Sequence, residues 1–448
     1  MNIMPNSQEA RDIAYHMHAY TNAARHAEVG PTVMTSGEGI YVKDNTGKRY
    51  IEAMAGLWSV AVGFSEQRLI DAATQQMQAL PFYHNFTHKS HGPAIDLAER
   101  LIGMAPVPMS KVHYTNSGSE ANDTIMKLIW YRSNAMGKPE KKKIISRERA
   151  YHGVTVGAGS LSGLSYMQQS FDLPIPQVLH TTCPHYWKEG CDGETEEEFA
   201  SRCAQDLDDL IQAEGPDTVA AFYSEPLMGA GGVIVPPKTY WEKIQAVLNK
   251  YDILLVADEI ICAFGRTGKM FGCETFDIQP DVMVMSKQLT SSYIPFTAFM
   301  INDRVYEPIA EESGRIGVLG HGLTGGGHPV GAAVALENLK IIGERGLVAH
   351  AADVGQELQQ GLRKFADHDQ VGEVRGVGLI AAMELLPETP DSPAGAIGAK
   401  MNAILAEKGL ISRNMVDSMA FCPPLIIEKP QIADILSIVE QGLDDLAA

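Results

Sequence analysis

Short runs of β-branched, aromatic and other apolar residues alternate with helical patterns through the middle of this chain. Such runs occupy residues 111–116, 142–146, 218–225, 253–259 and 282–287. Continuous apolar strands that alternate with helices indicate a mostly parallel sheet covered by helices on both faces. The pattern therefore predicts a fold of the α/β class.

The pattern changes near residue 330. Residues 330–346 and 354–368 have the spacing of amphipathic helices, and residues 371–385 have the pattern of strands in a separate small sheet. The last predicted helix places one set of apolar side chains on a single face: Ile432, Ile435, Leu436, Val439 and Leu443. We therefore expect a smaller α+β domain at residues 330–448.

Residues 1–60 precede the central pattern and include a strand–turn–strand signal at residues 39–53. This N-terminal segment cannot form a core alone, so we expect it to pack with the smaller domain. The large α/β domain is then expected at residues 61–329. No internal repeat or low-complexity tract interrupts it.

The charge balance narrows the range of partners. The chain of 448 residues has 36 Lys and Arg against 55 Asp and Glu, so its net charge is −19. Nucleic acids and anionic membranes bind basic surfaces, and neither is expected as a partner. The longest apolar runs, such as residues 329–336, are far shorter than the roughly 20 residues of a membrane-spanning helix.

The cysteines and the first residues indicate the compartment. None of the six cysteines forms a C-x-x-C pair, so neither a metal site nor a thioredoxin-like motif is indicated. Reduced thiols are the simpler interpretation in so long a chain. The first 20 residues lack a basic region followed by an apolar core, so we expect no signal peptide and a cytoplasmic location.

Polar residues follow several of the predicted strands. They are the loop "NSGSEAN" at residues 116–122, Glu225, Asp258 with Glu259, and Lys287. Ligands bind outside the carboxyl ends of the strands in open α/β sheets. A lysine at the tip of a buried strand also needs a partner for its charge, and these carboxylates supply one. The sequence therefore predicts a site at this edge of the sheet.

The loop at 116–122 contains a glycine and leads into a predicted helix, whose apolar face includes Ile125, Leu128 and Ile129. Free N–H groups and the helix dipole at such a position favour a phosphate. Ser117 and Glu120 also have the spacing of a capping box, so Ser117 could simply cap the helix. The loop has neither G-x-G-x-x-G nor G-x-x-x-x-G-K-[ST], which disfavours dinucleotides and ATP.

A phosphate-binding loop, an aspartate and a lysine at strand ends together suit pyridoxal 5′-phosphate. Lys287 would form the Schiff base with the aldehyde of this cofactor. Asp258 would keep the pyridine nitrogen protonated, so that the ring can stabilise a substrate carbanion. Tyr151 in "RAYHG" could stack on the ring, although it could equally be a half-buried loop tyrosine.

Motifs in the same order resemble those of the class III (omega) aminotransferases, in the fold-type I pyridoxal-phosphate superfamily. The most specific block is "LLVADEIICAFGRTGKMFGCETFDIQPDVMVMSKQLTSSYIP" at 254–295. "GLWSVAVGF", "TNSGSEAND", "AYHG", "EPLMGAGG" and "AFCPPLII" are also similar to family motifs. The resemblance extends over essentially the whole chain and implies a large central domain with a smaller α+β domain.

The resemblance also implies roles for individual residues. The expected cofactor-binding residues are Ser117, Gly118, Ser119, Tyr151, Glu225, Asp258, Ile260, Lys287 and Thr324. Gly118 and Ser119 would hold the phosphate, with Tyr151 and Ile260 on the two faces of the ring. Glu225 would support the region of Asp258, and Lys287 and Asp258 would be catalytic. Thr324 would come from the neighbouring subunit, which implies a homodimer or a dimer of dimers.

The resemblance further assigns the substrate side of the site. The residues expected to line the amine pocket are Leu57, Trp58, Phe86, Tyr151 and Ala230. Arg413 stands where the family has an arginine that can swing into the site. A mobile guanidinium can bind the carboxylate of a keto acid and withdraw when an amine without a carboxylate binds.

Three positions depart from the family pattern. Gly325 and Gly326 in "HGLTGGGHP" replace a tyrosine and a serine, which suggests a more mobile loop or a wider site. Gln288 follows the lysine where glycine is frequent, and its role is not evident from the sequence. Val416 stands where a glycine is expected, which could alter the movement of Arg413.

The resemblance implies a transaminase that moves an amino group from an amine or ω-amino acid to a keto acid, with pyruvate as the expected acceptor, through pyridoxamine phosphate. A decarboxylase or aminomutase of the same fold would use the same lysine and aspartate. A non-catalytic α/β binding protein is a more remote alternative. The sequence leaves the amine donor open.

Overall fold

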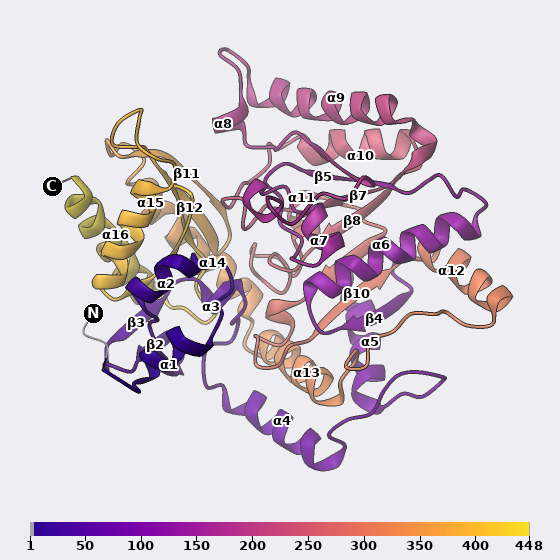
Figure 1. Ribbon diagram of the computed structural model, residues 1–448, viewed down its shortest axis with the longest axis horizontal. Coiled ribbons are helices and arrows are strands. Elements are labelled where there is room, and N and C mark those ends of the chain that lie inside the picture. The colour runs from indigo at the N-terminus through magenta and orange to yellow at the C-terminus, as the bar shows by residue number, and fades with distance from the viewer. Residues whose placement is uncertain (1–3, 448) are drawn as a thin grey trace.

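Seven strands form the central sheet of the computed structural model, which describes residues 4–447 (Figure 1). In spatial order they are β4 (Lys111–Thr115), β10 (Thr297–Ile301), β9 (Val282–Met285), β8 (Leu254–Asp258), β7 (Val219–Ser224), β5 (Lys143–Arg147) and β6 (Val178–Thr181). Strand β10 runs antiparallel to both of its neighbours, and the pairs from β9 to β6 are parallel. The predicted mostly parallel sheet is confirmed.

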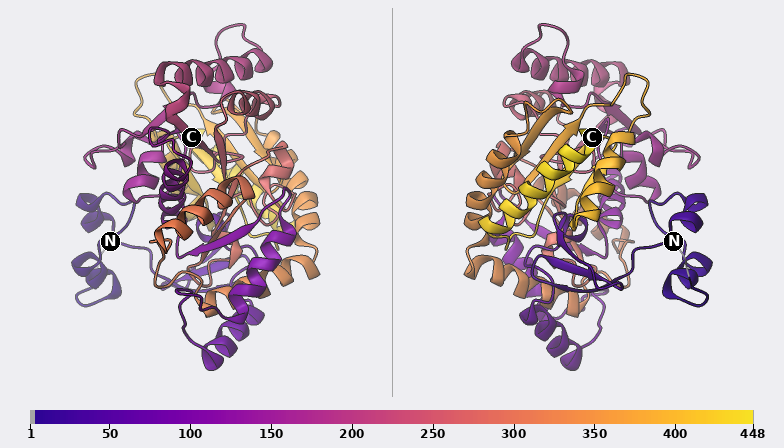
Figure 2. Two further views of the ribbon diagram at one scale, coloured as in Figure 1. Left: turned by 90° about the vertical axis from the view of Figure 1, so that its right-hand side faces the viewer. Right: turned by 90° about the vertical axis from the view of Figure 1, so that its left-hand side faces the viewer.

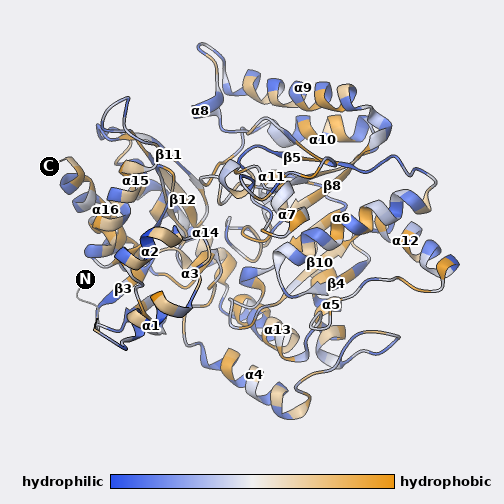
Figure 3. Cartoon of the chain, viewed as in Figure 1, coloured by the Kyte–Doolittle hydropathy of each residue, from blue (hydrophilic) through white to orange (hydrophobic). Residues whose placement is uncertain are grey.

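Helices cover both faces of this sheet, because its strands are apolar on both sides. In β8, Leu254 and Val256 belong to one buried cluster, whereas Leu255 and Ala257 belong to another. The first cluster includes α6 (Gly118–Ala135) and α12 (Asp303–Ile316). The second includes α4 (Gln67–Ala79), α5 (Gly92–Met104), α9 (Glu196–Glu214), α10 (Tyr240–Lys250) and α13 (Pro329–Glu344). Figure 3 shows hydrophobic central strands and outer helices that alternate in hydropathy.

A second sheet of four antiparallel strands lies in the C-terminal part. Its order is β11 (Val371–Val377), β12 (Ile380–Leu385), β15 (Ser418–Phe421) and β14 (Arg413–Met415). The helices of this part are α14 (Leu347–Arg363), α15 (Ala396–Glu407) and α16 (Lys429–Ala447). Ile432, Ile435, Val439 and Leu443 are buried on one side of α16, as the pattern predicts.

A third sheet joins the two ends of the chain. Strands β1 (Met34–Glu38), β2 (Tyr41–Asp44) and β3 (Arg49–Glu52) form an antiparallel ladder, and β3 pairs in parallel with β13 (Leu410–Ile411). Before this ladder come α1 (Gln8–Tyr15) and α2 (Ala23–Val29), which project from the side of the molecule (Figure 2). The proposed division at residues 60 and 329 stays a prediction.

The remaining elements are short: α3 (Ala55–Trp58), α7 (Val156–Leu161), α8 (Tyr186–Glu189), α11 (Gly272–Phe276) and the 3₁₀ turns η1 (Ser165–Met167), η2 (Pro216–Thr218) and η3 (Lys287–Leu289). Two strands of the central sheet, β6 and β10, were not indicated by the apolar runs. No helix in the described part of the chain is long and apolar enough to cross a lipid bilayer.

Candidate functional site

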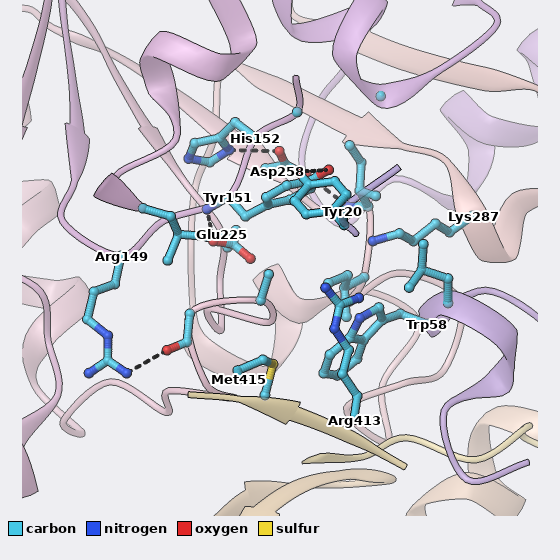
Figure 4. Close-up of a pocket in the computed structure, with 18 of the residues that line it drawn as sticks. Tyr20, Trp58, Arg149, Tyr151, His152, Glu225, Asp258, Lys287, Arg413 and Met415 are labelled. Carbon is cyan, nitrogen blue, oxygen red and sulfur yellow. Dashed lines mark hydrogen bonds and ion pairs between the residues drawn. The ribbon is translucent and has the colours of Figure 1, made fainter. Parts of the chain in front are cut away.

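A cavity of about 740 Å³ lies where β7, β8 and β9 end (Figure 4). Its lining includes most of the residues singled out in the sequence: Leu57, Trp58, Gly118, Ser119, Tyr151, Glu225, Ala230, Asp258, Ile260, Lys287 and Arg413. These residues come from segments up to about 350 positions apart along the chain. The fold therefore brings the predicted set together at the carboxyl edge of the sheet.

Asp258 is held in one orientation at the end of β8. Its side chain is buried, and Oδ2 accepts hydrogen bonds from His152 Nδ1 at 2.8 Å and from Asn122 Nδ2 at 3.0 Å. The backbone N–H of Ile260 donates to Oδ1 at 3.2 Å. Three donors on both oxygens therefore fix the position of the carboxylate.

Asn122 and His152 were not among the predicted site residues. Both occur inside motifs that were recognised, "TNSGSEAND" and "AYHG". Asn122 also donates to the carbonyl of His152 at 2.7 Å, so the two side chains reinforce each other beside Asp258. Their place inside these two motifs was the only signal in the sequence.

Lys287 follows β9 in the turn η3, and its backbone has a φ of 40°. The side chain is half-buried and points into the same space as Asp258 (Figure 4). Burial lowers the pKa of Lys287 to about 8, although the nearby carboxylates of Asp258 and Glu225 oppose this shift. Among the described residues, no carboxylate lies within ion-pair distance of its Nζ atom. A large share of this amine is therefore neutral near pH 8.

The two other glutamates at this edge of the sheet have different orientations. Glu225 Oε1 accepts from the N–H of Tyr151 at 3.0 Å, and Oε2 accepts from Gly229 at 2.8 Å. Burial raises the pKa of Glu225. These bonds fix the segment that carries Tyr151, so Glu225 supports the cavity wall as well as lining it.

Glu259 does not reach the cavity, although the sequence placed it beside Asp258. Its carboxylate accepts from the N–H groups of Gly272 at 2.9 Å and Cys273 at 2.6 Å, and burial raises its pKa to about 7. Adjacent residues at the end of a strand point to opposite sides. The expectation that Glu259 would converge with the others is therefore wrong.

The loop before α6 combines a cap with a close contact. Ser117 Oγ accepts from the N–H of Glu120 at 3.2 Å and caps the helix. Glu120 does not complete a capping box, because its carboxylate accepts from the N–H of Asn116 at 2.8 Å instead. At Gly118, a Cβ atom would lie 2.5 Å from Ile260 Cδ1, so only glycine fits without displacing that side chain. Ser117 is exposed and outside the cavity lining.

Two arginines line the cavity, and only one has hydrogen-bond partners. Arg149 Nη1 lies 3.1 Å from His185 Nδ1, and Nη2 donates to the carbonyl of Gly231 at 2.8 Å. The backbone of Arg413 pairs with Ala420 in the sheet, but its side chain has no hydrogen bond or ion pair with any described residue. It points into the cavity on the same side as Trp58 (Figure 4). Arg413 is therefore the arginine free to bind an anion.

The hairpin that carries Arg413 contains a strained residue. Val416, at the turn between β14 and β15, has a φ of 57° and a side chain that is 50% exposed. A β-branched residue in the left-handed region is unusual, since its Cβ atom meets the backbone. This conformation explains why a glycine is expected at this position.

The N-terminal segment also contributes to the cavity, which the sequence did not indicate. Ala19 and Tyr20 are part of its lining, and Tyr20 Oη lies 3.5 Å from Tyr151 Oη. The signal was weak, because Tyr20 lies in a polar, histidine-rich segment with no recognised motif.

Phe86 and Thr324 lie outside the lining of this cavity, and both side chains are exposed. Phe86 packs near the loop at 321–329, where a Cβ on Gly322 would lie 2.7 Å from its ring. Gly325 and Gly326 fit closely against the end of β4: an added Cβ would lie 2.6 Å from Asn116 Oδ1 or 2.7 Å from the Tyr114 carbonyl. The glycines thus allow close packing of the loop in this chain.

The role of Gln288 becomes clear from its contacts. It is fully buried, and Nε2 donates to the carbonyls of Ile261 and Ala263, both at 2.9 Å. Arg266 Nη2 lies 3.4 Å from its Oε1. Gln288 therefore connects the turn that carries Lys287 to the loop that follows Asp258.

Comparison with known proteins agrees with this geometry. The family model for aminotransferase class-III matches residues 22–443. A probable gamma-aminobutyrate transaminase 3, mitochondrial, from Oryza sativa subsp. indica is 48% identical over 93% of this chain and 83% of its own. The omega transaminase from Pseudomonas jessenii, solved in complex with PMP, is 59% identical over 98% of each chain, with a TM-score of 0.97.

A further solved structure, of a transaminase with L-ala, is 64% identical over 93% of this chain and 99% of its own, with a TM-score of 0.92. The family match, the sequence identity and the structural agreement extend over nearly the whole chain. The chain therefore belongs to the class III aminotransferases, enzymes that use pyridoxal 5′-phosphate to move an amino group from an amine to a keto acid.

Proposed function

We propose that this enzyme takes the amino group from an amine or ω-amino acid and gives it to pyruvate, with Lys287 as the catalytic lysine. The observation that carries this proposal is the arrangement of Lys287, Asp258 and the unpaired Arg413 around one cavity. Lysine and aspartate serve the chemistry that both substrates share. Arg413 serves the carboxylate that only some substrates carry.

The residues that line the cavity fit pyridoxal phosphate. Asp258 is fixed by three hydrogen bonds and would hold a proton on the ring nitrogen. Tyr151 and Ile260 would lie against the two faces of the ring. Gly118 and Ser119, at the start of α6, would hold the phosphate at the positive end of the helix dipole. When bound, the cofactor supplies the electron sink that stabilises a substrate carbanion.

Lys287 would act as general base and then as general acid. Its neutral amine would take the proton from the substrate carbon that bears the amino group, and the resulting ammonium would then donate a proton to the cofactor carbon C4′. A pKa of about 8 suits both tasks near neutral pH, because neither form is scarce. The carboxylates of Asp258 and Glu225 would stabilise the ammonium form.

Arg413 would bind the carboxylate of the keto acid. A guanidinium forms paired hydrogen bonds with a carboxylate, and Arg413 has no competing partner among the described residues. Arg149 cannot do this without breaking its bonds to His185 and Gly231. The relative solved with L-ala supports pyruvate as acceptor, because alanine is the amino form of pyruvate.

The names of the curated relatives support an ω-amino acid as donor. Several are called gamma-aminobutyrate transaminases, and they are 46–48% identical to this chain. We include simple amines in the proposal, because Leu57 and Trp58 give the cavity an apolar side.

A homodimer is part of this proposal. Thr324 and Phe86 are exposed and lie outside their own chain's cavity, as expected for residues that complete the site of a second subunit. We keep a cytoplasmic location as a prediction, although the plant relatives are named as mitochondrial or chloroplastic proteins.

The decisive experiment combines an amine panel with pyruvate. The purified, cofactor-loaded enzyme is incubated with γ-aminobutyrate, β-alanine, a diamine or an aryl amine, and both products are quantified. Alanine and the carbonyl product in equal amounts would support the proposal. Release of CO₂ without alanine would indicate a decarboxylase, and transfer to 2-oxoglutarate but not to pyruvate would overturn the proposed acceptor. Lys287→Ala is the matched control and should form neither product.

A further inference from the structure

Three histidines surround one carboxylate in the N-terminal segment, outside the catalytic cavity. Asp12 Oδ1 lies 2.6 Å from His18 Nε2 and 3.0 Å from His26 Nε2, and Oδ2 lies 3.0 Å from His16 Nδ1. The ring centroid of His18 is 4.4 Å from that of His16 and 4.3 Å from that of His26. The ligand atoms of Asp12, His16 and His18 therefore lie close together, and His26 reaches the same carboxylate from α2.

Hydrogen bonding alone gives no reason for this concentration of imidazoles. All three histidines contact the one carboxylate of Asp12. One histidine would suffice to pair with this single charge. Three imidazoles and one carboxylate are, in contrast, a complete set of four ligands for a transition-metal ion.

We propose that Asp12, His16, His18 and His26 bind a divalent transition-metal ion of the Zn²⁺ class. The ligand atoms of the first three residues all lie within 4.8 Å of one another. Bonds of about 2.0–2.1 Å in a tetrahedral Zn²⁺ site place ligand atoms roughly 3.4 Å apart. The contacts of 2.6–3.0 Å between Asp12 and the histidines would therefore lengthen slightly around the ion, and any wider separations among the ligand atoms would shorten.

The three imidazoles among the four proposed ligands indicate which type of ion would bind. Imidazole nitrogens favour zinc, copper, nickel and cobalt, whereas calcium and magnesium favour sites made of oxygen atoms. A hollow of about 450 Å³ lies beside His18 and His26 and gives a hydrated ion access to the site. The side chain of His16 is 65% exposed and leaves a second side open.

The proposed site would also act on the catalytic cavity. Its ligands lie on both sides of Ala19 and Tyr20 in the sequence, and these two residues line the cavity. Tyr20 Oη lies 3.5 Å from Tyr151 Oη, and the Tyr20 backbone has a φ of 51°. A bound ion would close the segment from Asp12 to His26 into a loop and hold Tyr20 over the cavity.

Metal binding is tested directly on the full-length enzyme, loaded with cofactor and without a histidine tag. After equilibrium dialysis against Zn²⁺, elemental analysis should find about one ion per chain. The double variant His18→Gln/His26→Gln should lose this ion, whereas the control His88→Gln/His368→Gln should keep it. The proposal is overturned if the wild-type enzyme retains no Zn²⁺ or if the first variant retains as much as the wild type.

Limited proteolysis gives a second, independent measurement. Arg11 and Arg25 are exposed and lie at the two ends of the proposed loop. Zn²⁺ should slow tryptic cleavage at both residues by roughly 10-fold, because proteolysis requires the segment to open. The same slowing should be absent from His16→Gln, which removes one ligand and leaves the half-buried Asp12, His18 and His26 unchanged. Equal cleavage rates with and without Zn²⁺ in the wild-type enzyme would contradict the closure of this loop.

Discussion

The two walls of the catalytic cavity differ in how firmly their polar groups are held. The inner wall, formed by His152, Glu225 and Asp258, is buried, and its carboxylates accept defined hydrogen bonds, one of them from Asn122 behind the wall. The outer wall is formed by Tyr20, Leu57, Trp58, Arg413 and Val416. On it, Leu57 and Val416 are half exposed, and the guanidinium of Arg413 has no partner among the described residues.

This difference matches the two demands on an aminotransferase. The cofactor is the same in both half-reactions, so the groups that hold it can be fixed in advance. The substrate changes from an amine to a keto acid, so a fixed cation would be left unpaired with one of them. We therefore expect substitutions on the inner wall to impair both half-reactions, and those on the outer wall to separate them.

Lys287→Ala tests the centre of the cavity and should have the largest effect. The variant lacks the amine that would transfer the proton, and we expect turnover to fall by roughly three orders of magnitude or more. Borohydride reduction of the wild-type enzyme followed by peptide mapping should find the cofactor on Lys287. A label on another lysine would contradict the assignment. The exposed Lys364→Ala is the control.

Asp258→Asn tests the inner wall. Asparagine keeps the shape but removes the charge that would hold the ring-nitrogen proton, so we expect both half-reactions to slow roughly 100-fold or more. Single-turnover measurements with the amine and with pyruvate should show similar losses. A loss confined to one half-reaction, with the cofactor fully bound, would show that the inner wall also discriminates between substrates.

The pH dependence of Lys287 follows from its lowered pKa. Amine-reactive reagents attack the neutral form, which for Lys287 increases as the pH rises through about 8 and then reaches a plateau. An ordinary lysine with a pKa of about 10.4 is roughly 100-fold less reactive than this at pH 8. Mass spectrometry of the labelled apoenzyme measures the rate at each pH.

The same titration has an internal control. Because Asp258 raises the pKa of Lys287, Asp258→Asn should move the curve to lower pH. A wild-type curve that keeps rising to pH 10 would show that Lys287 is not desolvated in solution.

Arg413→Ala tests the outer wall. Loss of the charged hydrogen bonds to a carboxylate should cost about 2 kcal/mol, or roughly 30-fold in KM for pyruvate. The half-reaction with an amine that lacks a carboxylate should change little. Arg413→Lys should restore part of the affinity, because it keeps the charge but not the paired geometry. Equal losses in both half-reactions would identify Arg413 as structural and remove the contrast between the walls.

Val416→Asn should have the smallest effect and refines the description of the outer wall. Asparagine tolerates the left-handed conformation better than valine, so relief of strain should stabilise the hairpin by about 1 kcal/mol. Thermal unfolding measures this change, and the exposed Val318→Asn provides the control. A decrease in stability would show that contacts of the valine side chain outweigh its backbone strain.

The sequence by itself determined the sheet and the centre of the site. Strands that are apolar on both faces can be stable only between two layers of helices, so the α/β class followed from local pattern. Asp258 ends one such strand and Lys287 comes two residues after another, and parallel strands end at one edge. Their convergence with the loop at 116–122 could therefore be predicted without coordinates.

Tertiary structure decided which polar groups are engaged. Glu259 and Asp258 are neighbours in the sequence, yet one binds the backbone at Gly272 and the other faces the cavity. Asn122 and His152 meet at Asp258 although 136 and 106 positions separate them from it. Such contacts depend on the rotation of each side chain at its strand or helix end, which the local pattern does not specify.

The substrate wall depended most on tertiary structure. Arg149 and Arg413 are the same residue type, and only the folded structure shows that the guanidinium of Arg149 is already bonded to His185 and Gly231. Tyr20 reaches Tyr151 across 131 positions, with no periodic signal in its segment. The local sequence pattern indicates which apolar residues are buried. The pairing of polar groups depends instead on distant segments that meet only in the folded chain.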